Sequence, residues 1–215
     1  MRSLQFGVKH LLDRLIGLLL LVVLAPLLAA IALGIKLADG GPPFFRQARV
    51  GRQGRPFVIW KFRTMPPGTD RLLDEKGRAG YVKRVTGVGK LLRSTSLDEL
   101  PQLFNILNGT MSLIGPRPAV PSHLERYTAQ QKKRLAMKPG VTGLAQVSGR
   151  NLLSWSRRIE LDIAYIERYS LWLDFKILLR TVRVVLLREG IVVDTNPAHV
   201  DDLADDNPRT RAKTR

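Results

Sequence analysis

The hydrophobic positions of the chain are concentrated near the N-terminus, in an uncharged run of 21 residues, LIGLLLLVVLAPLLAAIALGI, at positions 15–35. A helix of this length can cross a hydrocarbon core of about 30 Å. Pro26 stands close to the centre of the run. Because proline removes a helical hydrogen bond and clashes with the preceding turn, the pattern predicts a kink at this point.

Basic residues lie on both sides of this run. Arg2, Lys9 and Arg14 precede it, and seven lysines and arginines occur in residues 36–63. A cleaved signal peptide has a shorter apolar segment, so we do not expect cleavage. A spanning helix predicts more lysine and arginine on one side, whereas a re-entrant hairpin returns both flanks to one membrane face. The pattern favours the hairpin only slightly and leaves a simple span open.

Shorter periodic segments follow. Residues 44–45 and 57–60 are predicted to be strands joined by a turn at 51–54. The helical periodicities predict helices at about 99–107, 122–137 and 155–187. The last of these mixes apolar, aromatic and basic residues, which is typical of an in-plane helix at a membrane surface, and a packed core helix fits the pattern equally well. The proline-rich segment 112–122 is predicted to be a loop.

Composition narrows the chemistry. The chain of 215 residues has no cysteine, which excludes disulfides, thiolate zinc sites and a cysteine nucleophile. Its 35 lysines and arginines against 18 acidic residues indicate an anionic partner. Nucleic acid, lipid headgroups and phosphorylated small molecules all meet that condition. The three histidines have no metal-ligand spacing, and the glycines of 138–151 match neither standard nucleotide-binding loop.

Two adjacent carboxylates, Asp98 and Glu99, stand out in this basic chain. Ser96 and Glu99 have the spacing of a capping box, but Pro101 would then be the fifth helical residue, where an N–H group is needed. Asp98 as the cap places Pro101 in the first turn instead. A carboxylate pair at the positive end of a helix can cap it, bind Mg²⁺ or attack phosphorus. A second pair, Asp74 and Glu75, is expected to be solvated surface.

Four segments, in this order, carry a resemblance to a known family: GPPFFRQARVGRQGRPFVIWKFRTM, LLRSTSLDELPQLFNILNGTMSLIGPRP, KPGVTGLAQVSGRN and LDIAYIERYSLWLDFKILLRTV. The chain resembles the bacterial sugar transferases, the monotopic phosphoglycosyl transferases, over roughly residues 8–190. The resemblance implies transfer of a phospho-sugar from a UDP-sugar to polyprenyl (undecaprenyl) phosphate, with release of UMP and a requirement for Mg²⁺. This is the first membrane step in building a glycoconjugate. The expected location is the cytoplasmic face of the bacterial inner membrane.

The resemblance also implies roles for individual residues. Asp98 matches the nucleophile that forms a covalent phospho-sugar enzyme, and we place the Mg²⁺ ligand there as well. Glu99 matches its partner in proton handling and dyad geometry. The remaining expected substrate-binding residues are Lys61, Arg63, Arg93, Pro116, Arg117, Pro118 and Arg150. The residues before Arg84 depart from the family pattern, because Val82 and Lys83 stand where an aspartate is common.

The resemblance implies a re-entrant helix broken at Pro26, which decides between the hairpin and the span. We therefore expect a mostly helical, membrane-associated α/β fold with in-plane amphipathic helices. The expected divisions are a membrane-embedded helix at 1–38, a cytosolic catalytic domain at 39–193 and a disordered polar tail at 194–215. No nucleic-acid partner is expected, and a homo-oligomer is compatible with the sequence. The alternative function is a non-catalytic, membrane-anchored adaptor that binds anionic partners through its basic surface.

Overall fold

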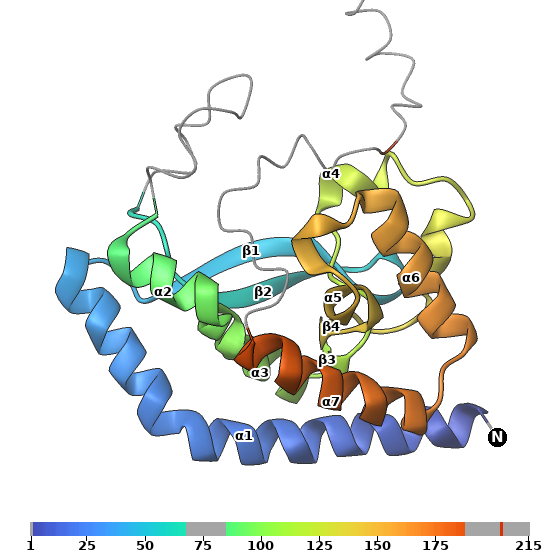
Figure 1. Cartoon of the computed structure of the whole chain (residues 1–215), viewed down its shortest axis with the longest axis horizontal. Helices are drawn as coiled ribbons and strands as arrows, with labels where there is room; N and C mark the ends of the chain where they lie inside the picture. Colours follow the sequence, from blue (N-terminus) through green and yellow to red (C-terminus); the bar gives the residue numbers. More distant parts are fainter. Residues whose placement is uncertain (1, 68–84, 188–202, 204–215) are drawn as a thin grey trace, which may run out of the picture.

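A computed structural model describes residues 2–67, 85–187 and 203. The first element is a long apolar helix, α1 (Arg2–Asp39), which is the one helix in this part of the chain long and apolar enough to cross a membrane. Only 11% of its most apolar window is buried inside the protein. The helix bends along its length (Figure 1) and contains Pro26. The expected interruption at Pro26 is therefore a bend within a continuous helix, since neighbouring turns keep their hydrogen bonds.

Both ends of α1 are held by the rest of the protein. Near its start, the buried Lys9 Nζ lies 2.7 Å from Asp174 Oδ2. One turn later, Asp13 accepts hydrogen bonds from Ser112 Oγ at 2.6 Å and from the Leu113 amide at 3.2 Å. At its end, Asp39 forms an ion pair with Arg63. Lys9, Asp13 and Arg63 are buried, and buried charged groups require partners. These pairs therefore fix α1 to the body of the protein at both ends.

The middle of α1 packs against the segment that follows the carboxylate pair. Leu20, Leu21 and Leu24 contact a core cluster that contains Leu103 and Ile106. Gly17 allows this approach, because a Cβ there would lie 3.1 Å from Ile106 Cγ2. The apolar helix thus supports the candidate site directly.

The predicted strand pair is confirmed. Strands β1 (Phe44–Val50) and β2 (Pro56–Phe62) are antiparallel, with Phe44 opposite Phe62 and Val50 opposite Pro56. The connection η1 (Arg52–Gly54) turns through Gln53 and Gly54, which both have positive φ. Near the end of β2, the side chain of Lys61 reaches the carboxylate pair, where it forms an ion pair with Glu99.

The candidate site is built from short elements after residue 85. These are α2 (Gly87–Thr95), η4 (Leu97–Gln102) and α3 (Leu103–Leu107). A second sheet joins β3 (Ser112–Ile114) and β4 (Gly140–Thr142) in parallel. The predicted loop at 112–122 therefore contains a strand. The sequence did not reveal it because its partner lies 28 residues away, at Gly140.

Two predicted helices are divided in the structure. The segment 122–137 forms α4 (Pro121–Leu124) and η5 (Gln131–Ala136) rather than one helix. The segment 155–187 forms α6 (Trp155–Glu167) and α7 (Leu171–Leu186). Ser170 separates α6 from α7, since its side chain accepts a hydrogen bond from the Leu173 amide as an N-cap. The short α5 (Leu144–Val147) and η6 (Arg150–Leu152) precede α6.

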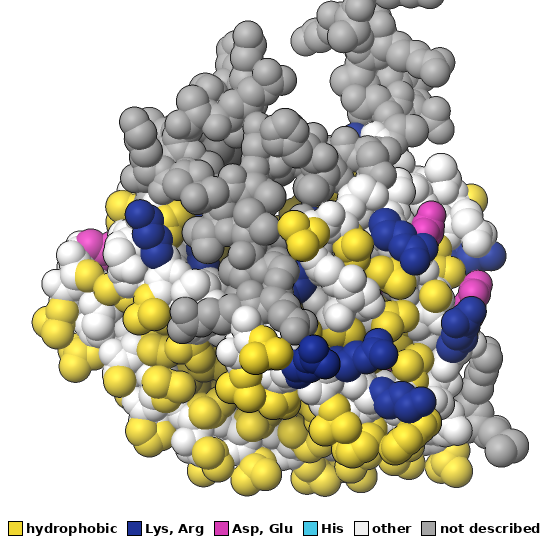
Figure 2. Space-filling view, in the orientation of Figure 1, with side chains coloured by type: hydrophobic (Ala, Val, Ile, Leu, Met, Phe, Trp, Pro, Cys, Tyr) yellow, Lys and Arg dark blue, Asp and Glu magenta, His cyan; other side chains and the backbone are white. Residues whose placement is uncertain are grey.

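The lower face in Figure 1 is apolar. Figure 2 shows hydrophobic side chains gathered along this face, over α1 and α7, with a group of lysines and arginines just above α7. The large exposed hydrophobic residues of α7 and its end are Trp172, Phe175, Leu178, Leu179, Val182, Leu186 and Leu187. Monomeric soluble proteins rarely expose an apolar face of this extent, and such faces mark contact with a membrane or partner.

Leu203 is the only residue of the predicted disordered tail that the structure describes. It is 5% exposed and packs with Tyr127, Ile159 and Ile163. Its carbonyl accepts a hydrogen bond from Arg126 Nη2 at 2.5 Å. One described residue does not test the disordered tail expected at 194–215, which stays a prediction. The rest of the tail lies outside the described residues, as do Asp74, Glu75 and residues 82–84.

Candidate active site

The carboxylate pair lies in the first turn of η4. Ser96 ends α2 in a left-handed conformation (φ 59°) and is also the N-cap residue of η4. The helix therefore begins two residues earlier than predicted, and Asp98 is not its cap. The Ser96 side chain makes no capping bond, because it accepts a hydrogen bond from Arg150 Nη2 at 2.7 Å. Pro101 is accommodated inside η4, before the α-helical segment begins at Leu103.

Glu99 is held by two cations. Its Oε1 lies 2.6 Å from Lys61 Nζ and 3.1 Å from Arg117 Nη2. Burial would raise the pKa of Glu99, but the charges and hydrogen bonds of Lys61 and Arg117 outweigh it and hold this pKa below its usual range. Glu99 is consequently ionised at neutral pH and joins β2 to the loop that carries Arg117.

Asp98 has a different environment. It is half-buried, and its carboxylate makes no hydrogen bond or ion pair with any residue in the described part of the chain. Burial, followed by the negative charge of Glu99, raises the pKa of Asp98 to about 6 against the opposing effect of Lys61, Arg93 and Arg117. Two adjacent carboxylates with pKa values moved in opposite directions are typical of a site with divided roles.

Arg93 and Arg150 stand beside the pair without bonding to it. Arg93 Nε donates to Thr64 Oγ1 at 2.9 Å. Gly89 permits this packing of α2 on residue 64, because a Cβ there would lie 2.2 Å from the Thr64 carbonyl oxygen. Arg150 has a left-handed backbone (φ 49°), and its buried Nη1 has no hydrogen-bond partner among the described residues. Such a buried donor is available to a ligand.

The structure thus brings together most of the predicted polar residues: Lys61, Arg93, Asp98, Glu99, Arg117 and Arg150. Arg63 is not among them. It is 7% exposed, and its guanidinium pairs with Asp39 at the end of α1. Pro116 and Pro118 are both buried. They fix the backbone around Arg117, and any contact of their own with a nucleotide stays a prediction.

Sequence reasoning missed the residues that support these side chains. Thr64 orients Arg93, and Ser96 orients Arg150. Arg134 and Asp162 lie behind Arg117 and are each 1% exposed. Arg134 lies outside the four quoted motifs, and the motifs that contain Thr64, Ser96 and Asp162 did not reveal their roles, because their contacts join segments far apart in the chain.

The donor set fits a magnesium ion that also binds a substrate. No group of three or more histidine, aspartate or glutamate side chains is arranged for a metal in the described residues. Mg²⁺ needs no such group, since it commonly takes one or two carboxylates together with substrate phosphates and water. Asp98 offers carboxylate oxygens that no other described residue occupies.

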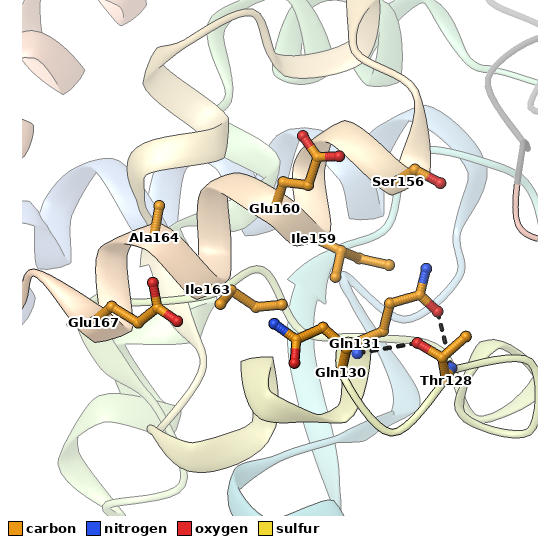
Figure 3. Close-up of a pocket in the computed structure, with 9 residues that line it drawn as sticks. All are labelled: Thr128, Gln130, Gln131, Ser156, Ile159, Glu160, Ile163, Ala164 and Glu167. Atoms are coloured by element: carbon orange, nitrogen blue, oxygen red, sulfur yellow. Dashed lines mark hydrogen bonds between the residues drawn. The ribbon is translucent and has the colours of Figure 1, made fainter.

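A separate pocket of about 460 Å³ lies between α6 and the residues before η5. Figure 3 shows Thr128 and Gln131 hydrogen-bonded to each other at its edge, with Glu160 and Glu167 on the facing helix. None of the predicted site residues lines this pocket. We therefore place the candidate active site at the carboxylate pair, where the perturbed pKa values and the cations meet.

Comparisons with known proteins establish the family of the chain. A family model described as "Bacterial sugar transferase" matches residues 4–188. The uncharacterized sugar transferase EpsL of Bacillus subtilis is 47% identical over 161 residues, which cover 73% of this chain and 76% of that protein. The chain belongs to the bacterial sugar transferase family. The match includes α1, so the apolar helix is part of what this bacterial sugar transferase shares with its family.

Two further relatives carry more informative names. The undecaprenyl-phosphate galactose phosphotransferase of Salmonella typhimurium is 43% identical over 204 residues, covering 88% of this chain and 42% of that protein. The UDP-glucose:undecaprenyl-phosphate glucose-1-phosphate transferase of Klebsiella pneumoniae is 44% identical over 184 residues, covering 81% and 39%. This sugar transferase thus spans about two fifths of the length of these two relatives.

Proposed function

We propose that this bacterial sugar transferase moves a phospho-sugar from a UDP-sugar to polyprenyl phosphate. The observation that carries the proposal is the unpaired Asp98 carboxylate, set among Lys61, Arg93 and Arg117 beside an ionised Glu99. The names of the Salmonella and Klebsiella relatives supply the substrate class, a UDP-sugar and undecaprenyl phosphate. Undecaprenyl phosphate is accordingly the acceptor we propose.

In the first step, an Asp98 carboxylate oxygen attacks the sugar-side phosphorus of the donor. A bond forms between that oxygen and phosphorus, the bond from phosphorus to the bridging oxygen breaks, and UMP leaves with the electron pair. With a pKa of about 6, Asp98 is mostly ionised at neutral pH and retains more basicity than an ordinary aspartate. The positive side chains around it offset the charge of the diphosphate.

In the second step, an oxygen of polyprenyl phosphate attacks the same phosphorus, and the Asp98 carboxylate is released. The product is a polyprenyl diphosphate sugar. A phosphate monoester has a second pKa near 6, so the acceptor needs little help to lose its proton at neutral pH. The lowered pKa of Glu99 makes it a weak base. We therefore assign Glu99 chiefly to holding Lys61 and Arg117 in place, rather than to proton transfer.

Magnesium fits this mechanism as a cofactor. Asp98 would hold Mg²⁺ together with substrate phosphate oxygens, and the bound ion would neutralise charge that develops on the diphosphate. The free Nη1 of Arg150 and the side chain of Arg93 are placed to bind phosphate oxygens.

We also propose that α1 is a re-entrant hairpin in the inner membrane, with both ends on the cytoplasmic face. The support is that Lys9 and Asp13 at one end, and Asp39 at the other, all bind the same body of the protein. A helix that left its first residues on the opposite face would separate Lys9 from Asp174. Tags placed before Lys9 and after Asp39 should both react with a membrane-impermeant reagent from the cytoplasmic side only, and labelling from opposite sides would rule out the hairpin.

The enzymatic proposal is tested by trapping the covalent intermediate. The full chain in detergent, given a panel of UDP-sugars with Mg²⁺ and no acceptor, should release UMP and gain the mass of one phospho-sugar on the peptide that contains Asp98. Asp98→Asn should lose both signals. Glu160→Gln, an exposed carboxylate on α6, is the matched control. Normal transfer to undecaprenyl phosphate by Asp98→Asn would show that the mechanism is wrong.

A further inference from the structure

Arg134 is a charged residue in a fully buried position. It lies in η5, is 1% exposed, and donates to three partners. Its Nη1 donates to the Tyr127 hydroxyl at 2.6 Å, and its Nη2 donates to the Arg117 carbonyl oxygen at 3.0 Å and pairs with Asp162. Its guanidinium also lies over the Tyr127 ring.

A buried ion pair is a costly way to fill this volume. Removing an arginine and a carboxylate from water carries a large desolvation penalty, and apolar residues of similar size often stabilise a fold as well or better. Arg134 offers something that an apolar residue cannot, a rigid fork of donors with one branch on the Arg117 main chain. The contact with Arg117 therefore needs an explanation beyond packing.

The Arg117 segment is pinned through its carbonyl groups. The Gly140 amide donates to the Pro116 carbonyl at 2.9 Å, and the Val50 amide donates to the Ala119 carbonyl at 2.9 Å. Between these two main-chain contacts, the Arg117 carbonyl receives the side chain of Arg134. The Arg117 side chain is 37% exposed and reaches Glu99. Its guanidinium can be placed accurately only if its backbone is held in place.

We infer that Arg134, held by Asp162, is a positioning residue that fixes the Arg117 backbone so that the Arg117 guanidinium reaches Glu99. This inference rests on the proposed function, because it assigns Arg134 to the work of the same site. Arg134 touches neither carboxylate of the dyad in the described structure, so it acts through Arg117 rather than on the substrate.

The test uses the full chain in detergent with variants that change the Arg134 guanidinium in different ways. Arg134→Lys keeps a positive charge for Asp162 but loses the forked arrangement of guanidinium donors. Arg134→Met combined with Asp162→Leu removes both charges and leaves no buried ion unpaired, which preserves folding. Arg157→Lys, on the exposed face of α6 and paired with Glu160, is the matched control.

Two readouts separate positioning from a general loss of stability. The first is kcat/KM for UMP release, measured for each Arg134 variant alone and combined with Arg117→Lys. We expect Arg134→Lys to lower kcat/KM about tenfold or more, the scale of a hydrogen bond to a charged group. Arg134→Lys should change kcat and KM in the same proportion as Arg117→Lys does. The double variant should have the same kcat/KM as Arg117→Lys alone. The second is hydrogen exchange of the peptide covering residues 115–120, which should quicken in both Arg134 variants and not in Arg157→Lys.

Each outcome supports or overturns the positioning role of Arg134 or the proposed function. Effects of Arg134→Lys and Arg117→Lys that multiply, or an Arg134→Lys enzyme with wild-type kcat/KM, would overturn the positioning role. Faster exchange spread evenly over the protein would also overturn it, because that is what a structural residue gives. A wild-type chain that releases no UMP defeats the proposed function instead. Exchange then still reports on the Arg134 contact, since it requires no activity.

Discussion

The raised pKa of Asp98 gives a sharp prediction about acid. Burial and the charge of Glu99 raise this pKa to about 6, and only the ionised carboxylate can attack phosphorus. A group with a pKa of about 6 is roughly nine-tenths ionised at pH 7 and roughly one-tenth ionised at pH 5. We therefore expect the rate of Asp98 labelling to fall about tenfold between these pH values. An aspartate with an ordinary pKa near 4 would lose only about a tenth of its activity over the same range.

The assay is the second-order rate constant for covalent labelling by UDP-sugar without acceptor, which corresponds to kcat/KM, with free Mg²⁺ fixed below the concentration that occupies Asp98 in the free enzyme. The acid limb of kcat/KM reports the free enzyme. The donor is a diphosphate diester without a proton that titrates between pH 5 and 8, and the acceptor phosphate is absent. A fall in this range therefore belongs to the protein.

The cause of the shift can be tested with Lys61, whose positive charge lowers the pKa of Asp98. Lys61→Gln should raise that pKa further and move the acid limb to higher pH. Lys90→Gln, an exposed lysine on α2, should leave the limb in place. A rate that stays flat down to pH 5, or a limb that Lys61→Gln does not move, would refute the assignment of the shift to Asp98 and its neighbours.

Three further predictions concern the supports of the site. Asp39→Ala should lower the free energy of unfolding by about 1–3 kcal/mol, because the buried Arg63 guanidinium loses its partner, and it should leave the KM for UDP-sugar unchanged. Leu203→Ala should cost about 2–4 kcal/mol in denaturant unfolding, whereas Leu152→Ala, at 65% exposure, should cost little; equal costs would mean that Leu203 is not docked in solution. Asn105→Ala removes a 1% exposed side-chain amide that accepts a hydrogen bond from the Trp60 amide and donates one to the Val58 carbonyl of β2. It should lower stability by about 2 kcal/mol and reduce kcat by loosening β2, which carries Lys61.

Local features of the sequence determined several elements correctly. The uncharged run at 15–35 predicted a long helix with a bend, since length and hydropathy are sufficient for such a helix. The glycine-containing turn at 51–54 predicted the β1–β2 pair, because hairpin partners are close in the chain. The adjacency of Asp98 and Glu99 and the basic residues near them marked the candidate site, and the four motifs led to the family that the comparisons establish.

Other features depended on contacts between distant segments. The pairing of β3 with β4 could not be read from residues 112–122 alone. The prediction of Asp98 as the cap is wrong, because Ser96 is the N-cap residue of η4, and the Ser96 side chain binds Arg150, 54 residues away. Arg63 resembled the other arginines in sequence, but only the fold turns it towards Asp39 and away from the dyad.

The sequence by itself determined that this protein has a long apolar helix, an excess of basic residues and a carboxylate pair, because each follows from neighbouring residues. Only the tertiary structure decided how the two carboxylates differ. Asp98 and Glu99 are adjacent and chemically alike, yet Glu99 is paired with Lys61 from β2 and Arg117 from a later loop, while Asp98 is half-buried and has no hydrogen-bond or ion-pair partner in the described residues. Burial and charge over distances of a few ångströms set their pKa values, and those distances are fixed by the fold.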